Sequence, residues 1–148
     1  MAILRTRYNY KNTGLLFLRL GIGIMFILHG WPKMSGGLEM WALVGSRMQS
    51  VGIDFMPEIW GFMAAFAETV GGALLVLGLF FRPVCILLVI TMLVATMSHI
   101  SNNEGFGGYS HALEAAILFF SLIFIGPGRY SLDKYFFPTN KNRATFQV

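Results

Sequence analysis

The sequence predicts an all-α integral membrane protein, folded as an antiparallel four-helix bundle in a single domain over residues 1–148. Hydrophobic residues make up 55% of the 148 residues and charged residues only 12%, with a mean hydropathy of +0.63. A soluble domain carries about 25% charged residues, so this chain lacks the polar surface that water requires. The composition excludes an ordinary soluble enzyme, a disordered tail and a nucleic-acid-binding domain. The single Cys85 excludes an intramolecular disulfide and a CxxC pair.

Four long apolar runs supply the predicted spans. Each is close to the ~20 residues that cross ~30 Å of hydrocarbon as an α-helix. Runs of this length are helices, because lipid offers the backbone no other hydrogen-bond partner. The turn before Pro83 is so short that the second and third spans form an antiparallel hairpin. The predicted spans cover residues 14–34, 57–80, 83–100 and 109–125.

The distribution of Lys and Arg predicts the orientation. Eight of the 11 lie in the N-terminal segment, in the turn before the third span or in the C-terminal tail. The positive-inside rule therefore places both termini in the cytoplasm. The first span carries Arg19 and has no A-x-A-like cleavage site, so we interpret it as a retained helix and not as a signal peptide.

Two polar segments flank the spans. Residues 35–56 are moderately apolar, which favours either an interfacial helix on the outer leaflet or an ordered loop packed over the bundle. The tail over residues 135–148 is polar and basic, and we expect it to be mobile or to touch anionic lipid.

Ionisable side chains within the spans are the most informative residues. Near the helix centre, Arg, Lys or Asp costs ~2.5–3.5 kcal/mol, so such residues survive when they are paired or face a cavity. Glu68 shares a helix face with small residues at i±3 and i±4 spacing, which is typical of a face where membrane helices approach closely. At ~1.5 Å per residue, His29, His99, Glu114 and Glu68 reach one half of the bundle, with Arg19 roughly 9 Å below Glu68. We therefore predict a polar pocket in the outer half.

Each candidate has a structural alternative. Arg19 and Glu68 could form a buried ion pair that fixes helix register, and the histidines could be hydrogen-bonded helix contacts. Lys33 and His111 lie near the water boundary, where solvation accounts for them, and are weaker candidates. No metal site is predicted, because H-x-x-x-H and E-x-x-H spacings do not occur. The candidate ligand-binding residues are Arg19, His29, Glu68, His99 and Glu114, followed by Lys33 and His111.

Several short motifs, taken in their order over residues 16–134, resemble the DoxX family of small four-helix membrane proteins. This resemblance implies the four-helix fold and a bacterial cytoplasmic (inner) membrane location. The family names derive from a thiosulfate:quinone oxidoreductase subunit and from membrane redox complexes linked to thiol and oxidative-stress defence. The motifs are LRLGIG at 18–23, HG at 29–30 with Lys33, AE at 67–68, GG at 71–72, LGL at 77–79, RP at 82–83 and GPGRYSLD at 126–133.

Three functions compete. In the first, the chain is a subunit of a redox complex whose pocket binds a quinone headgroup through His29 or His99, with Glu68 or Glu114 as a proton relay and Arg19 balancing the charge. The chain has no haem-attachment or Rossmann motif, so a soluble or membrane redox partner, or the quinone, would carry the electrons. The second is a small proton-coupled transporter or binding protein for a solute or lipid, for which a homo-oligomer would supply volume. The third is a structural assembly subunit.

Overall fold

The computed structural model describes residues 10–137, and within them the regular structure is entirely helical. Four of the helices are long and apolar enough to cross a membrane. This confirms the predicted all-α class and the four spans, with boundaries shifted by up to four residues. The helices are α1 (Lys11–Ser35), α2 (Gly37–Gly45), the 3-10 helix η2 (Ser46–Val51), α3 (Pro57–Leu77), α4 (Phe81–Ser101), α5 (Gly105–Ile125) and α6 (Leu132–Phe136).

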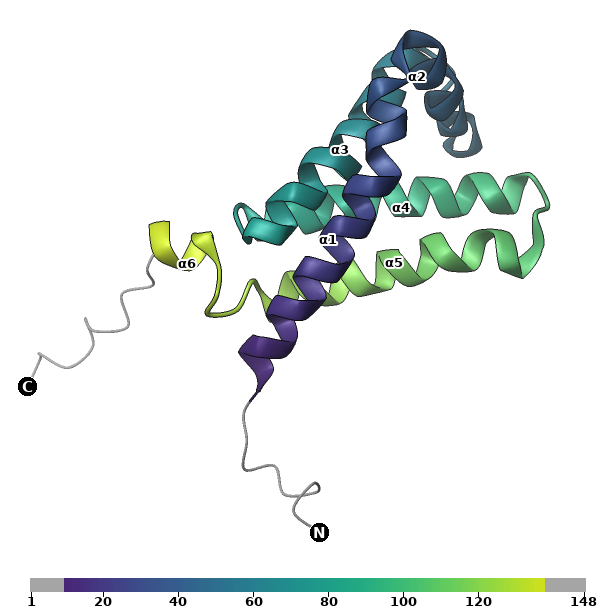
Figure 1. The fold of residues 1–148 in the computed structure, drawn as a ribbon. Coiled ribbons are helices and arrows are strands. Elements are labelled where there is room, and N and C mark those ends of the chain that lie inside the picture. The colour runs from purple at the N-terminus through teal and green to yellow at the C-terminus, as the bar shows by residue number, and fades with distance from the viewer. Residues whose placement is uncertain (1–9, 138–148) are drawn as a thin grey trace, which may run out of the picture.

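The long helices form two pairs. α1 packs along α3, and α4 packs along α5 (Figure 1). The start of α1, the α3–α4 turn and the end of α5 meet at one end of the bundle, which we call the Arg19 end. Toward the opposite end the two pairs diverge, and η2, which follows α2 in the chain, packs against α4 of the other pair. We call this second end the pocket end.

Glycines allow α1 and α3 to approach closely. A Cβ atom added to Gly23 would lie 2.7 Å from the carbonyl oxygen of Gly72, and one added to Gly72 would lie 2.7 Å from the carbonyl oxygen of Gly23. Gly30 is similarly close to Thr69. The small-residue face of α3 is therefore a helix contact, as its spacing predicts.

The segment after α1 is helical, and it packs over the bundle. Its predicted position on the outer leaflet stays a prediction. The indole N–H of Trp41 on α2 donates to the Lys33 carbonyl at 3.0 Å, and the Trp41 ring meets Phe62 of α3 edge-on. α2 therefore packs on α3, and the chain that follows it reaches α4 through η2.

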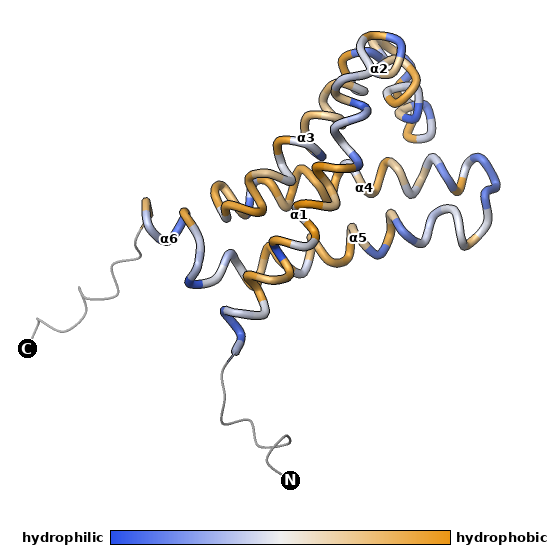
Figure 2. The backbone as a smooth tube through the Cα atoms, in the orientation of Figure 1, coloured by the Kyte–Doolittle hydropathy of each residue, from blue (hydrophilic) through white to orange (hydrophobic). Residues whose placement is uncertain are grey.

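The hydropathy pattern matches a membrane-spanning bundle. Hydrophobic residues predominate along the four long helices, while hydrophilic residues collect at the start of α1 and in the α4–α5 turn (Figure 2). Large apolar side chains such as Phe17 and Phe124 are about 70% exposed, as expected of a surface that faces lipid. The end of the tail expected to be mobile, residues 138–148, lies outside the described residues, and the predicted cytoplasmic placement of the termini stays a prediction.

Candidate ligand pocket between the two helix pairs

A cavity of about 870 Å³ lies at the pocket end, between the two helix pairs. Its volume falls within the roughly 300–1,000 Å³ that is typical of small-molecule sites. Most of its wall consists of Met, Leu, Ile, Val, Ala and aromatic side chains. The chain has three histidines, and all three line this one cavity. The ionisable lining residues are His29 and Lys33 of α1, Arg47 of η2, Glu68 of α3, His99 of α4, and His111 and Glu114 of α5.

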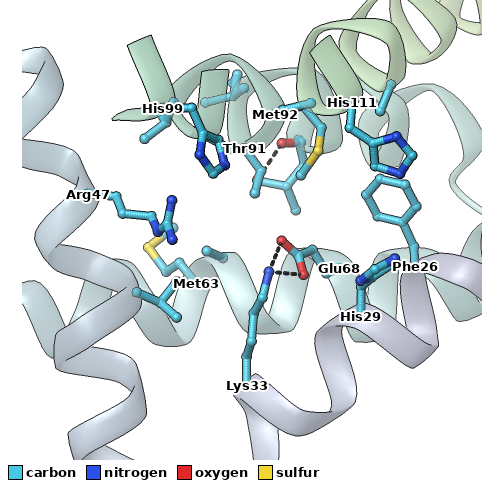
Figure 3. A pocket seen from close by; sticks show the side chains of 18 of the residues that line it. Phe26, His29, Lys33, Arg47, Met63, Glu68, Thr91, Met92, His99 and His111 are labelled. Carbon is cyan, nitrogen blue, oxygen red and sulfur yellow. Dashed lines mark hydrogen bonds and ion pairs between the residues drawn. The ribbon is translucent and has the colours of Figure 1, made fainter. Parts of the chain in front are cut away.

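An ion pair between Lys33 and Glu68 joins α1 to α3 in the pocket wall (Figure 3). The Lys33 ammonium donates to both carboxylate oxygens of Glu68, at 2.7 and 2.6 Å. The Glu68 side chain is only 5% exposed, while that of Lys33 is 33% exposed. Lys33, which the sequence places at the water boundary as a weaker candidate, is therefore the partner of the buried carboxylate.

Arg19 does not pair with Glu68, and this corrects the ion pair considered from the sequence. Its guanidinium donates four hydrogen bonds to carbonyl oxygens, and its side chain does not line the cavity. The residue is 1% exposed and lies 5.9 Å from the ring centroid of Phe81. Arg19 thus closes the opposite end of the bundle. The acceptors are Leu75 at 3.0 Å, Val76 at 2.9 Å, Pro127 at 2.8 Å and Tyr130 at 2.7 Å.

The spacing along α1 explains why Lys33, and not Arg19, pairs with Glu68. Arg19, Gly23, Phe26, Gly30 and Lys33 recur at intervals of three and four residues, so they share one helix face. That face packs on α3. Two cations on the same face, about four turns apart, therefore meet different parts of α3. Arg19 reaches the carbonyls at its C-terminal end, and Lys33 reaches Glu68 near its middle.

His99 lies at the end of α4 and is oriented by a residue that sequence reasoning missed. Its Nδ1–H donates to the Glu104 carboxylate at 2.7 Å. This hydrogen bond lowers the pKa of Glu104, and the charge of Arg47 adds to the effect. Because Nδ1 carries the proton, the other ring nitrogen, Nε2, is left to a ligand. Figure 3 shows His99 and Arg47 on the same side of the cavity. The sequence signal that could have predicted this contact is an acidic residue shortly after a histidine at the end of a helix.

We infer an opening of the cavity between α1 and α5, at His29, His111 and Glu114. The rings of Phe26 and Phe119 meet edge-on with centroids 4.8 Å apart, and they join the two helices below this opening. Nearer the pocket end, the two histidines and Glu114 line the cavity and are also exposed. His29 and His111 flank Phe26 in Figure 3. Both helices that flank this opening are long and apolar enough to cross a membrane.

The described residues provide no evident metal centre. Within residues 10–137, no three His, Cys, Asp or Glu side chains come together closely enough to hold a metal ion. The polar groups of the cavity instead suit a ligand bound by hydrogen bonds and charge.

The comparisons with known proteins agree with this fold. A family model described as DoxX matches residues 14–100. An uncharacterized protein of Haemophilus influenzae (strain Rd) is 32% identical over 134 residues, which cover 86% of this chain and 94% of that relative. Inner membrane protein YphA of Escherichia coli K12 is 30% identical over 131 residues, which cover 81% of this chain and 88% of YphA. No solved structure matches. Of the ionisable pocket residues, the family match includes His29, Lys33, Arg47, Glu68 and His99.

Proposed function

Because the chain belongs to the DoxX family and is a multi-pass inner membrane protein, we propose that its pocket binds a quinone. In this role the protein is a membrane subunit of a redox system and not a stand-alone enzyme. The observation that carries the proposal is a largely apolar cavity of about 870 Å³ into which the chain directs all three of its histidines and an ion pair.

The shape of a quinone suits this distribution of groups. A quinone headgroup is a flat ring with two carbonyl oxygens, and its hydrocarbon tail remains in lipid. The histidines can donate to or accept from these oxygens, while Met and aromatic side chains contact the ring. The opening between α1 and α5 would let the tail leave the cavity sideways.

The hydrogen bond to Glu104 makes His99 the best-placed quinone ligand. With Nδ1–H committed to Glu104, neutral His99 presents Nε2 as an acceptor for a quinol hydroxyl. Protonated His99 would instead donate from Nε2 to a quinone oxygen. Reduction of a quinone to a quinol consumes two electrons and two protons. The electrons would come from a redox partner protein, and Glu68 and Glu114 would relay protons.

Native mass spectrometry of gently extracted protein, with parallel quinone extraction, tests the proposal. We expect one quinone per chain in the wild type. His99→Gln and Glu68→Gln should lose it, whereas the control Glu39→Gln, exposed on α2, should retain it. A folded wild-type protein that carries only ordinary phospholipid would overturn the quinone assignment.

The opening toward lipid also favours a second candidate, the proton-coupled binding or passage of a lipid or amphiphilic solute. Liposomes that contain the protein would then show proton flux dependent on the added solute, and Glu114→Gln would abolish that flux. Absence of both bound ligand and flux, together with loss of a complex on deletion, would instead favour the assembly role.

A further inference from the structure

A second hollow, of about 620 Å³, lies at the Arg19 end, far from the quinone pocket along the helices. It is formed by α1, the end of α3 and the segment that contains α6. The two cavities share no lining residue. Three cationic side chains line this hollow: Arg19, Arg129 and Lys134.

The positive charge of this hollow is only partly balanced within the protein. Asp133 is the one acidic residue between 126 and 137, and its carboxylate accepts hydrogen bonds from the backbone N–H groups of Phe80 and Phe81 at 2.8 and 2.9 Å. The buried Arg19 uses its donors on carbonyl oxygens. The side chains of Arg129 and Lys134 make no hydrogen bond or ion pair with residues 10–137. An anion would therefore complete their interactions.

The segment that carries these cations is held firmly against the bundle. The Asp133 N–H donates to the Gly78 carbonyl at 3.0 Å, and the Arg129 N–H donates to the side-chain oxygen of Asn12 at 3.0 Å. Together with the Arg19 hydrogen bond to the Tyr130 carbonyl, these contacts tie the segment to both α1 and the α3–α4 turn. A preorganised site loses little conformational entropy when it binds.

Two exposed tyrosines line the hollow, close to the ends of the membrane spans. Tyr130 is 58% exposed and Tyr135 is 78% exposed, and the rings of Phe80 and Phe137 lie beside each other nearby. Tyr and Trp rings are enriched at the level of lipid headgroups, because one part of the ring is apolar and the other is polar. A ligand beside these tyrosines would therefore lie at the level of the lipid headgroups, which favours a lipid headgroup over a solute from bulk water.

We propose that the hollow binds the phosphate of an anionic phospholipid, with Arg129 and Lys134 as its ligands. The tyrosines would lie at headgroup level, and an acyl chain would follow the apolar residues Leu16 and Leu77, which also line the hollow. Basic pockets beside membrane helices recognise such headgroups through charge. The site is independent of the quinone proposal and stands if that proposal fails.

Native mass spectrometry in detergent micelles containing equal amounts of phosphatidylglycerol and phosphatidylcholine tests this site. The wild type should retain phosphatidylglycerol selectively. Removing one of the two charges should reduce the selectivity about fivefold. This factor corresponds to the contribution of about 1 kcal/mol that each Lys or Arg near the surface makes to binding an anionic membrane. We therefore expect a graded loss from Lys134→Gln or Arg129→Gln to the double variant.

Arg47→Gln is the matched control, because it removes an exposed arginine at the pocket end. It should leave the selectivity unchanged. Equal selectivity in the wild type and both single variants would overturn the proposal, as would an equal loss in the control. Displacement of the lipid by millimolar inorganic phosphate would identify a site for free phosphate, which also contradicts a lipid site. If the double variant does not fold, the two exposed single variants decide.

Discussion

The two ends of the bundle accommodate buried charge in opposite ways. At the Arg19 end, the guanidinium is surrounded by protein and donates to four carbonyl oxygens. At the pocket end, one ion pair and three histidines surround a cavity. A charge within a membrane is tolerated when it is paired or faces a cavity. Here carbonyl oxygens satisfy Arg19 at one end, while Lys33 pairs with Glu68 beside the cavity at the other. The comparison separates a group whose donors are used within the fold from groups that remain available to a ligand.

The packing of the backbone also differs between the two ends: it is close at the Arg19 end and open at the pocket end. At the Arg19 end, Gly78 adopts a φ of 66°, and a Cβ atom there would collide with the Arg19 guanidinium. At the pocket end, the two helix pairs diverge, and η2 reaches across to α4 (Figure 1). Close packing fixes the first end, while separation of the helices creates the second.

The largest expected difference between the ends is their accessibility from outside the membrane. In a Cys85→Ser background, Arg47→Cys should react with a membrane-impermeant maleimide in spheroplasts. Arg129→Cys should react only after lysis, because the positive-inside rule places its end in the cytoplasm. Gel shift after labelling gives an all-or-none result. The reverse pattern would invert the predicted orientation.

Arg19→Met should cause the largest loss of stability. The substitution removes all four hydrogen bonds of the guanidinium and leaves the partly buried carbonyls of Val76, Pro127 and Tyr130 without this donor. At about 1–3 kcal/mol for each unsatisfied group, the protein should unfold or lose at least about 3 kcal/mol. Arg47→Met, at an exposed position, should change stability by about 0.5 kcal/mol or less. Thermal unfolding in detergent compares the two variants, and equal melting temperatures would contradict the structural role of Arg19.

Gly23→Ala should have a smaller effect, because it tests only the approach of α1 to α3. The added methyl group would press on the Gly72 carbonyl and on Val76, which should cost about 1–3 kcal/mol. Gly21→Ala on the same helix is the control, since its methyl group would meet nothing within 4 Å. The same unfolding measurement should separate them, and similar stability would show that α1 and α3 can move apart without loss.

Sequence patterns were sufficient for the spans and for the inward direction of Glu68. Long apolar runs have one solution in lipid, and the small-residue stripe identifies the contact face of α3. The choice of partner for Glu68 could not be derived in this way. Lys33 and Arg19 share a face of α1, and the acceptors that compete for Arg19 include the carbonyl groups of Pro127 and Tyr130, far along the chain.

The same limit applies to the rim of the pocket. The clustering of His29, His99 and Glu114 follows from helix rise and alternating direction, and all three line the cavity. Arg47 reaches the cavity only because residues 46–51 fold as η2, and Glu104 reaches His99 only through the geometry of the α4–α5 turn. Loop conformation, which periodicity does not specify, decides these two contacts.

The smallest expected effect concerns Glu104, which lies outside the spans. The hydrogen bond from His99 lowers its pKa below the ordinary value of 4.5, so the folded protein favours the ionised form. The stabilisation is present above pH 4.5 and disappears as the pH falls through the lower pKa of the folded state. Wild type should therefore be slightly more stable than Glu104→Gln at pH 6, and the difference should shrink as the pH falls below 4.5. Melting temperatures measured across this range test the prediction, with Glu39→Gln as the control; a constant difference between wild type and Glu104→Gln would show that the Glu104 charge does not stabilise the α4–α5 turn.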